Sequence, residues 1–140
     1  MRRSRGLGGN MSGTDQDVVR EAFAAWEQGD NRAFFALVAQ DVTWRVIGTT
    51  PISGTYHSKR EFLMATAPFA DRLDGPISAK VLDVRQAGDK VYLEWEGTCT
   101  GRNGRPYHQT YCWAMRLGDG LVRDVVAYLD TEMVNAMFAD

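Results

Sequence analysis

The chain has 140 residues, enough for one domain with a sizeable core but not for two. Hydrophobic residues make up 44% and charged residues 24%, values typical of globular proteins. The formal net charge is -2, but without Arg2, Arg3 and Arg5 near the start it becomes -5. This acidic balance argues against a nucleic-acid or anionic-membrane surface, and no apolar run approaches the ~20 residues of a membrane helix.

The first segment, residues 1–13, is rich in Gly, Ser and Arg and lacks the apolar stretch of a secretory signal peptide. We expect a disordered extension there, followed by a single domain over residues 14–140. A cytoplasmic location follows as the expectation. Cys99 and Cys112 then serve as small buried packing groups, because no spacing of Cys or His indicates a metal site.

Capping signals predict the helices. Thr14, followed by Asp17, begins a first helix that ends at Gly29. A short second helix follows at once, so that the two form a hairpin. Ser58 and Glu61 form a capping box for a third helix, and a last helical turn closes the chain.

Alternating apolar and polar residues predict the strands. Residues 41–47 form one strand, and four more are expected at about 77–86, 90–100, 106–117 and 121–129. Short Gly-containing turns join these four into an antiparallel meander. Helices followed by long hairpin strands predict an α+β fold whose sheet curves over the helices. The cone-shaped cavity left between these layers is the expected ligand site.

Several segments carry a family resemblance: EQGD, FFALVAQDVTW, ISGTYHSKREF, GRNGRPYHQTY and LGDGLVRDVVAYLDTEM. In this order and spacing, the chain from Val18 to Phe138 resembles the SnoaL-like and ketosteroid-isomerase-like proteins of the nuclear transport factor 2-like superfamily. The resemblance implies a cone-shaped α+β barrel, with a curved antiparallel sheet wrapped over an N-terminal helical hairpin and a third helix. That superfamily includes isomerases, hydrolases, cyclases, dehydratases and non-enzymes, so the fold does not select the function.

Two activities of these relatives lack their residues here. Ala22 and Val46 stand where the resemblance places the Tyr and the base Asp of a ketosteroid isomerase. Of the groups that a limonene-epoxide hydrolase requires, only one acid is matched, at Glu96. A SnoaL-type cyclase, in contrast, needs a single carboxylate in an apolar pocket.

A two-residue turn at residues 103–104 predicts the pairing of the two strands that flank it. It places Glu96 opposite Tyr111 and Glu94 opposite Trp113, on one face of the sheet. If this face lines the cavity, burial and mutual repulsion suit one carboxyl for acid–base chemistry. The alternative is that the face is solvated, or that each Glu pairs with a nearby Arg.

The expected function is the binding of a small, mostly apolar organic molecule in the cone, with acid–base turnover of the isomerase or cyclase type. No cofactor and no metal are expected. The alternative is a non-catalytic ligand-binding or dimerisation module, so enzymatic activity stays open. The expected catalytic residues are Glu96 and Glu94, and the expected ligand-binding residues are Trp44, Gln109, Tyr111 and Trp113.

The opposite face of the sheet is expected to bind a partner. Trp95, Val126 and Tyr128 fall on that face, and an exposed apolar patch usually marks an interaction surface. The family resemblance favours a homodimer formed through this outer face, with no nucleic acid or membrane as a partner.

Overall fold

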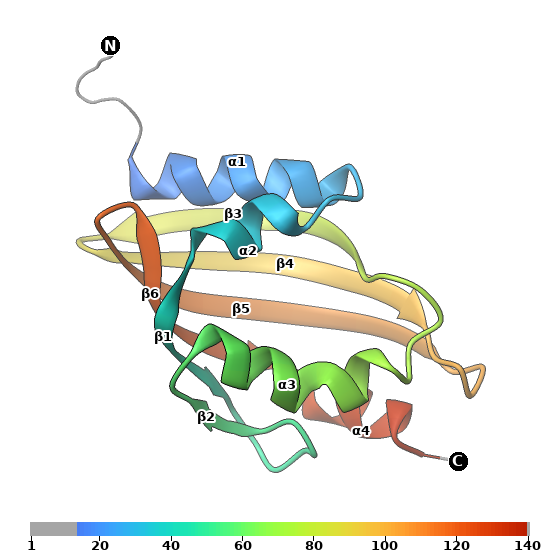
Figure 1. Ribbon diagram of the computed structural model, residues 1–140. Helices are drawn as coiled ribbons and strands as arrows, with labels where there is room; N and C mark the ends of the chain where they lie inside the picture. Colours follow the sequence, from blue (N-terminus) through green and yellow to red (C-terminus); the bar gives the residue numbers. More distant parts are fainter. Residues whose placement is uncertain (1–13, 140) are drawn as a thin grey trace.

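Over residues 14–139, which the computed structural model describes, the chain forms a curved mixed sheet with helices on its concave side and at one end (Figure 1). The expected disorder of residues 1–13 lies outside the described residues. The sheet order is β2–β1–β6–β5–β4–β3, and among the described strands only β1 and β6 pair in parallel. In chain order, the elements are α1 (Asp15–Glu27), α2 (Arg32–Leu37), β1 (Val38–Val46), β2 (Gly54–Tyr56), α3 (Lys59–Ala70), β3 (Ser78–Ala87), β4 (Lys90–Thr100), β5 (Pro106–Gly118), β6 (Leu121–Leu129) and α4 (Thr131–Met137).

Helices α1 and α3 begin at the predicted capping residues. Thr14 and Ser58 each accept a hydrogen bond from the backbone N–H three residues later, at 3.2 and 3.0 Å. Asp130 caps α4 by accepting from the N–H of Glu132 at 3.1 Å. Each bond satisfies one of the N–H groups that a helix start leaves unpaired, and the predicted starts of α1 and α3 are confirmed.

Helix α1 lies along the edge strand β3 (Figure 1). The backbone N–H of Gln16 donates to the side chain of Gln86 at 2.9 Å, and the backbone N–H of Gln86 donates to the side chain of Gln16 at 3.1 Å. Farther along, the N–H of Val81 donates to the carboxylate of Glu27 at 2.8 Å. Polar side chains of α1 therefore hold the helix on the backbone of the edge strand.

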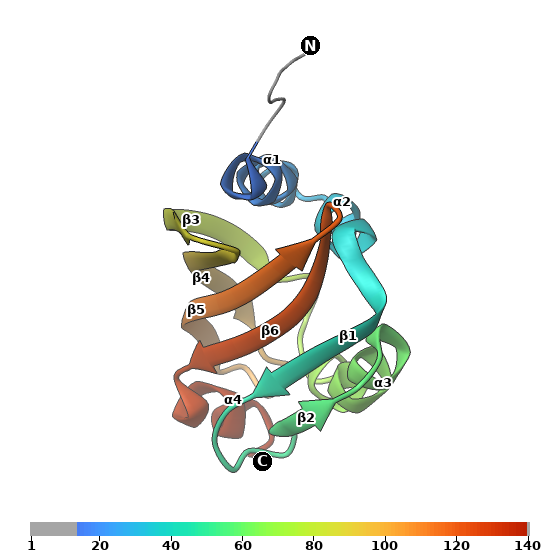
Figure 2. The same cartoon turned by 90° about the vertical axis from the view of Figure 1, so that its left-hand side faces the viewer.

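The sheet curves from β3, beside α1, round to β1 and β2, beside α3 (Figure 2). Aromatic side chains fill much of the space enclosed. Phe23 of α1 packs edge-to-face against Phe34 of α2 and Trp95 of β4, with centroids 5.0 and 5.2 Å apart. Phe62 of α3 stacks on Trp44 of β1 at 4.1 Å. The predicted α+β architecture is confirmed, and no helix in the described part of the chain is long and apolar enough to span a membrane.

The turn between β4 and β5 contains three residues, not the two that were predicted. The N–H of Gly101 donates to the carbonyl of Arg105 at 2.8 Å, which leaves residues 102–104 in the loop. Gly104, the third of them, has a φ of 83°. Three-residue hairpin loops place a left-handed residue at this position, and glycine adopts it without strain.

The extra loop residue shifts the pairing of β4 and β5 by one. Trp95 faces Tyr111, and both side chains are buried. Glu94 faces Cys112, and Glu96 is likewise on the opposite, outer face. The predicted pairing of Glu96 with Tyr111 is therefore wrong, because a slip of one residue moves every side chain of a strand to the other face.

Candidate functional site

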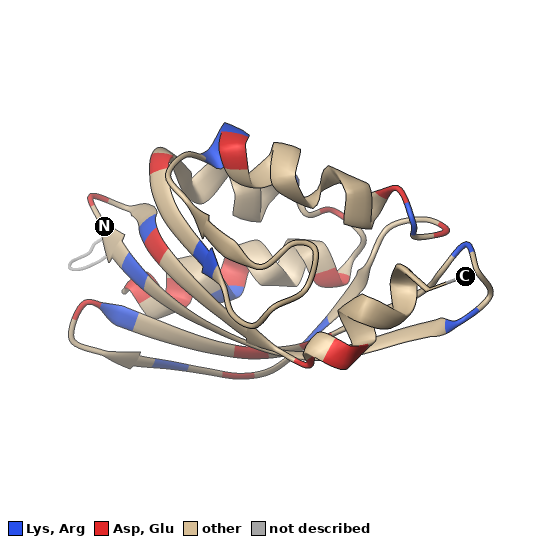
Figure 3. Cartoon of the chain, turned by 90° about the horizontal axis from the view of Figure 1, so that it is seen from below, with Lys and Arg blue, Asp and Glu red and all other residues tan. Residues whose placement is uncertain are grey.

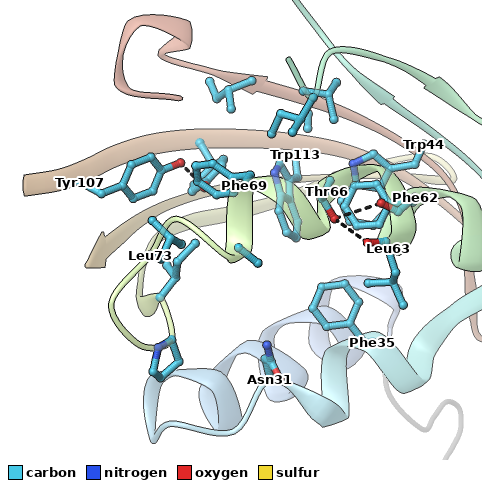
Figure 4. A pocket seen from close by; sticks show the side chains of 18 of the residues that line it. Asn31, Phe35, Trp44, Phe62, Leu63, Thr66, Phe69, Leu73, Tyr107 and Trp113 are labelled. Carbon is cyan, nitrogen blue, oxygen red and sulfur yellow. Dashed lines mark hydrogen bonds between the residues drawn. The ribbon is translucent and has the colours of Figure 1, made fainter. Parts of the chain in front are cut away.

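A cavity of about 310 Å³ lies between the concave face of the sheet, helices α2 and α3, and the segment before β3 (Figure 4). Exposed lining residues mark its opening: Asn31, Leu63 and Pro76. The buried side chains of Trp95 and Trp113 form part of its floor on β4 and β5. This volume is within the range of small-molecule sites, at its lower end.

All four tryptophans of the chain line this cavity. Trp113 lies among the others, with its ring centroid 5.1 Å from Trp44, 5.0 Å from Trp95 and 6.2 Å from Trp26. Side chains alternate along a strand, so residues 44, 95 and 113 reach the concave face from three different strands. The sheet therefore supplies a continuous aromatic wall.

The indole N–H groups of this wall differ in their hydrogen bonding. Trp26 donates to the carbonyl of Ile77 at 3.0 Å. The Nε1 atoms of Trp44, Trp95 and Trp113 are buried and have no hydrogen-bond partner among the described residues. Leaving such donors unpaired costs free energy, which the burial of large aromatic surfaces offsets in this wall.

No lining residue within the described part of the chain is Asp, Glu, Lys, Arg or His. The hydroxyl of Thr66 donates to the carbonyl of Phe62 in its own helix at 3.0 Å. The same part of the chain contains no group of three or more His, Cys, Asp or Glu side chains that could hold a metal ion. The cavity therefore offers a bound molecule apolar contact and a few neutral polar groups, but no counter-charge.

The hydroxyls of Tyr107 and Tyr111 form the main polar feature of the buried wall. Their oxygens are 2.6 Å apart, and both residues line the cavity. Burial raises the pKa of Tyr107 to about 12, although the bonds from Tyr111 and Gln109 act in the opposite direction. Burial also raises the pKa of Tyr111 well above its usual value, and the neighbouring Tyr107 adds to this. Both hydroxyls are therefore protonated at neutral pH.

The structure brings together three of the residues expected to bind a ligand. Trp44, Tyr111 and Trp113 line the cavity, while their contact with a ligand stays a prediction. Gln109 is buried but is not part of the lining. Its side-chain amide donates to the carbonyl of Asp130 at 2.8 Å and accepts from the N–H of Asp130 at 2.7 Å. Gln109 therefore joins β5 to the beginning of α4.

The two expected catalytic acids lie outside the cavity. Glu94 is exposed on the outer face, and Glu96 is half-buried with its carboxylate 3.5 Å from Nε2 of His108. The expectation that this pair faces the cone is wrong, so acid–base chemistry by Glu94 or Glu96 inside the cone has no geometric basis. Figure 3 shows acidic and basic residues interspersed over the helices, strands and turns.

The sequence patterns did not place two aromatic residues of the wall in the cavity. Trp95 was expected on the outer face, but it is 1% exposed and lines the cavity. The sequence patterns assign no role to Tyr107, although it is four residues before Tyr111 on one strand and must share its face. Val126 and Tyr128 do lie on the outer face, and the side chain of Tyr128 is exposed.

Comparisons with known proteins agree with this architecture. A family model described as the SnoaL-like domain matches residues 19–125. No curated protein matches the chain. An NTF2-like protein from Burkholderia thailandensis is 23% identical, with a TM-score of 0.76, over 92% of this chain and 100% of that chain.

Two other solved structures extend the comparison. A protein with a cystatin-like fold from Xanthomonas campestris is 20% identical, with a TM-score of 0.76, over 90% of this chain and 98% of that one. TerC, co-crystallised with polyporic acid, is 16% identical, with a TM-score of 0.72, over 88% of this chain and 96% of its own. These likenesses show the fold, and the family model covers most of the chain. The chain belongs to the SnoaL-like domain family, and its fold is that of the NTF2-like structures.

Proposed function

We propose that this protein binds a small, uncharged, mostly apolar organic molecule in the aromatic cavity. The observation that carries the proposal is a lining of aromatic and aliphatic side chains with no charged residue among those described. Apolar surface removed from water contributes roughly 25 cal/mol per Å² to binding. An ionised ligand would lose its hydration there without gaining a counter-charge. The co-crystal of TerC with polyporic acid supports small-molecule binding by this fold.

The structure favours ligand binding alone over an isomerase- or cyclase-like reaction in which a carboxylate acts as the acid or base. The acidic pair Glu94 and Glu96 lies on the outer face, and the described cavity lining contains no carboxylate and no imidazole. The high pKa values of Tyr107 and Tyr111 let these hydroxyls donate hydrogen bonds but prevent them from acting as bases at neutral pH.

Tryptophan fluorescence provides the test, because every tryptophan lines the cavity. Titration with 2-isopropenylnaphthalene, a flat hydrocarbon, is expected to change the emission in a saturable manner. The carboxylate 2-naphthoate is expected to bind at least about tenfold more weakly, because its charge has no partner in the cavity. Equal affinity for the two probes would contradict the selection for uncharged ligands.

A pair of variants on α3 locates the binding site. Ala70 lines the cavity at its exposed rim, whereas Ala67, one turn earlier, is exposed outside it. Ala70→Phe should fill part of the space and weaken binding of the hydrocarbon about tenfold or more. Ala67→Phe should bind it like the wild type. Unchanged binding by Ala70→Phe would place the ligand elsewhere and refute the proposal.

We also propose that the outer face of the sheet forms a homodimer. Tyr92 and Tyr128 are 40% and 47% exposed on this face, on either side of the buried Ala114 and half-buried Cys112 of β5. Sedimentation equilibrium of Tyr128→Lys is expected to show a monomer. The matched control Met64→Lys, at a 64% exposed position on α3, should keep the association state of the wild type. A dimer that persists in Tyr128→Lys would exclude this interface.

A further inference from the structure

We infer that the paired hydroxyls of Tyr107 and Tyr111 anchor an uncharged carbonyl oxygen of the ligand, so that the cavity selects aryl ketones and related flat carbonyl compounds over hydrocarbons of the same shape. This inference rests on the proposed binding function and specifies the chemistry of its ligand. Three observations support it: the position of the two phenol rings, the number of hydroxyl hydrogens that they have available, and the lower suitability of the other polar groups in the lining.

Packing holds both phenol rings in place. The residues are four apart on β5 and therefore project from the same face of the sheet. Tyr111 stacks on Trp95 with ring centroids 4.2 Å apart, and Tyr107 packs edge-to-face on Phe69 at 5.3 Å. Figure 4 shows the Tyr107 hydroxyl directed toward Phe69 and the interior of the cavity. The two oxygens are 2.6 Å apart, and both residues line the cavity that a ligand would enter.

The hydrogen inventory leaves one donor available. Two phenol groups carry two hydroxyl hydrogens, and only one can lie in the bond between them. The structure gives these hydroxyls no second acceptor among the described residues. The remaining O–H belongs to a buried wall, since Tyr107 and Tyr111 are 1% and 7% exposed. A buried donor without an acceptor is costly, and a ligand oxygen would remove that cost.

Either hydroxyl can donate within the pair, and we assign Tyr111 as the donor, which leaves the hydrogen of Tyr107 free for the ligand. In this arrangement the oxygen of Tyr107 accepts from the hydroxyl of Tyr111 and lies near the side-chain amide of Gln109, and both interactions stabilise the oxygen as an acceptor. A ligand group that donates would compete for this occupied oxygen. A ligand carbonyl would accept the remaining hydrogen, and the bond from Tyr111 would polarise it further.

The other neutral polar groups of the lining are less suitable. The hydroxyl of Thr66 already donates within its own helix, to the carbonyl of Phe62. Asn31 is exposed at the opening, where water competes for its amide. The buried hydroxyl pair is therefore where an added oxygen atom should increase the affinity of an apolar ligand most.

The test compares 2-acetonaphthone with 2-isopropenylnaphthalene, which has a CH₂ group where the ketone has its oxygen. Because a neutral hydrogen bond adds a modest net free energy, the wild type should bind the ketone about threefold to tenfold more tightly than the hydrocarbon. Tyr107→Phe should abolish this preference while leaving the affinity for the hydrocarbon within about twofold, which also shows that the variant folds. Tyr56→Phe is the matched control, since the Tyr56 hydroxyl donates to the carbonyl of Ile52 and is not part of the cavity lining.

Infrared spectroscopy of the bound ketone gives a second, direct measurement. The carbonyl stretch of 2-acetonaphthone should lie at a lower frequency in the wild type than in Tyr107→Phe, because a hydrogen bond weakens the C=O bond. Equal affinities of the two probes for the wild type, or a ketone preference that survives in Tyr107→Phe, would overturn the anchor while leaving the binding function intact. Failure of both probes to bind would refute the binding function and the anchor with it.

Discussion

The indole ring of Trp95 stacks on the phenol ring of Tyr111, with centroids 4.2 Å and planes 15° apart. The two residues face each other across β4 and β5. Gly97 lies two residues farther along β4, on the same face, and its lack of a side chain leaves room for both rings. A Cβ at position 97 would lie 3.0 Å from Cε2 of Tyr111 and 3.1 Å from Cζ3 of Trp95. The floor of the cavity thus depends on glycine at this position.

Gly97→Ala is therefore expected to destabilise the protein. The added methyl group would also lie 2.8 Å from Cγ2 of Ile77, so several packed side chains must move together. Overpacking of this kind lowers the free energy of unfolding by about 1–3 kcal/mol, which urea denaturation measures. Gly118→Ala is the control, because a Cβ there has only an ordinary contact of 3.5 Å with Arg123. Equal stability of the two variants would show that the ring stack tolerates the extra group.

Gln109→Leu is expected to loosen the attachment of α4 to the sheet. The substitution keeps the side-chain size but leaves the N–H and the carbonyl of Asp130 without their partners at 2.7 and 2.8 Å. Two unpaired backbone groups should lower the free energy of unfolding by about 2–4 kcal/mol. Thr110→Val, at the exposed neighbouring position, should change it by less than about 0.5 kcal/mol. An unchanged free energy of unfolding in Gln109→Leu would contradict the role of Gln109 in joining β5 to α4.

Alkaline conditions should destabilise the fold through Tyr107. Its pKa is about 12 in the folded protein, against 10.0 for an ordinary tyrosine. The folded state therefore keeps a proton that the unfolded chain releases, and this stabilising contribution is complete below pH 10 and is lost as the pH rises toward 12. The shift corresponds to about 3 kcal/mol.

Chemical denaturation at a series of pH values measures this effect. Tyr107→Phe should lose stability less steeply between pH 10 and 12 than the wild type, because it has no Tyr107 proton to retain. Tyr92→Phe, at a position 40% exposed on the outer face, should keep the wild-type slope. Identical slopes for all three proteins would contradict the proposed origin of the alkaline destabilisation.

Substitution of the outer acids should not affect ligand binding. Glu94→Gln and Glu96→Gln alter side chains on the convex face of the sheet, away from the cavity. Both variants should bind 2-isopropenylnaphthalene and 2-acetonaphthone within about twofold of the wild type, as measured by tryptophan fluorescence. If either variant bound the probes about tenfold more weakly or worse, these carboxylates would have a part in ligand binding.

Local sequence signals predicted the elements of this fold well. The caps at Thr14 and Ser58 depend on hydrogen bonds to backbone three residues away, which the sequence reveals directly. Period-two patterns likewise placed β3 to β6 to within about a residue. The short strand β2 was missed, because three residues paired with β1 leave little periodicity.

Local sequence signals could not predict which side chains of β4 face the cavity and which face outward. Two-residue and three-residue loops both suit a glycine near residues 103–104, and the choice reverses every side chain. Asn103 takes part in the longer loop by donating to the carbonyls of Ala136 and Ala139, at 3.0 and 2.9 Å. These groups are more than 30 residues away in the sequence, so no local pattern reveals them. The candidate site was therefore predicted with its tryptophans at 44 and 113 but without Trp95 and Tyr107.

The hydrogen bonds from α1 to β3 have a consequence for aggregation. An uncovered edge strand is a template on which another chain can add a strand. Here Gln16 and Glu27 occupy backbone N–H groups of β3, and the opposite edge, β2, is only three residues long. Loss of α1 would therefore do more than expose apolar core surface. It would free a ten-residue strand edge for pairing between chains, so α1 also serves as a guard against edge-to-edge aggregation.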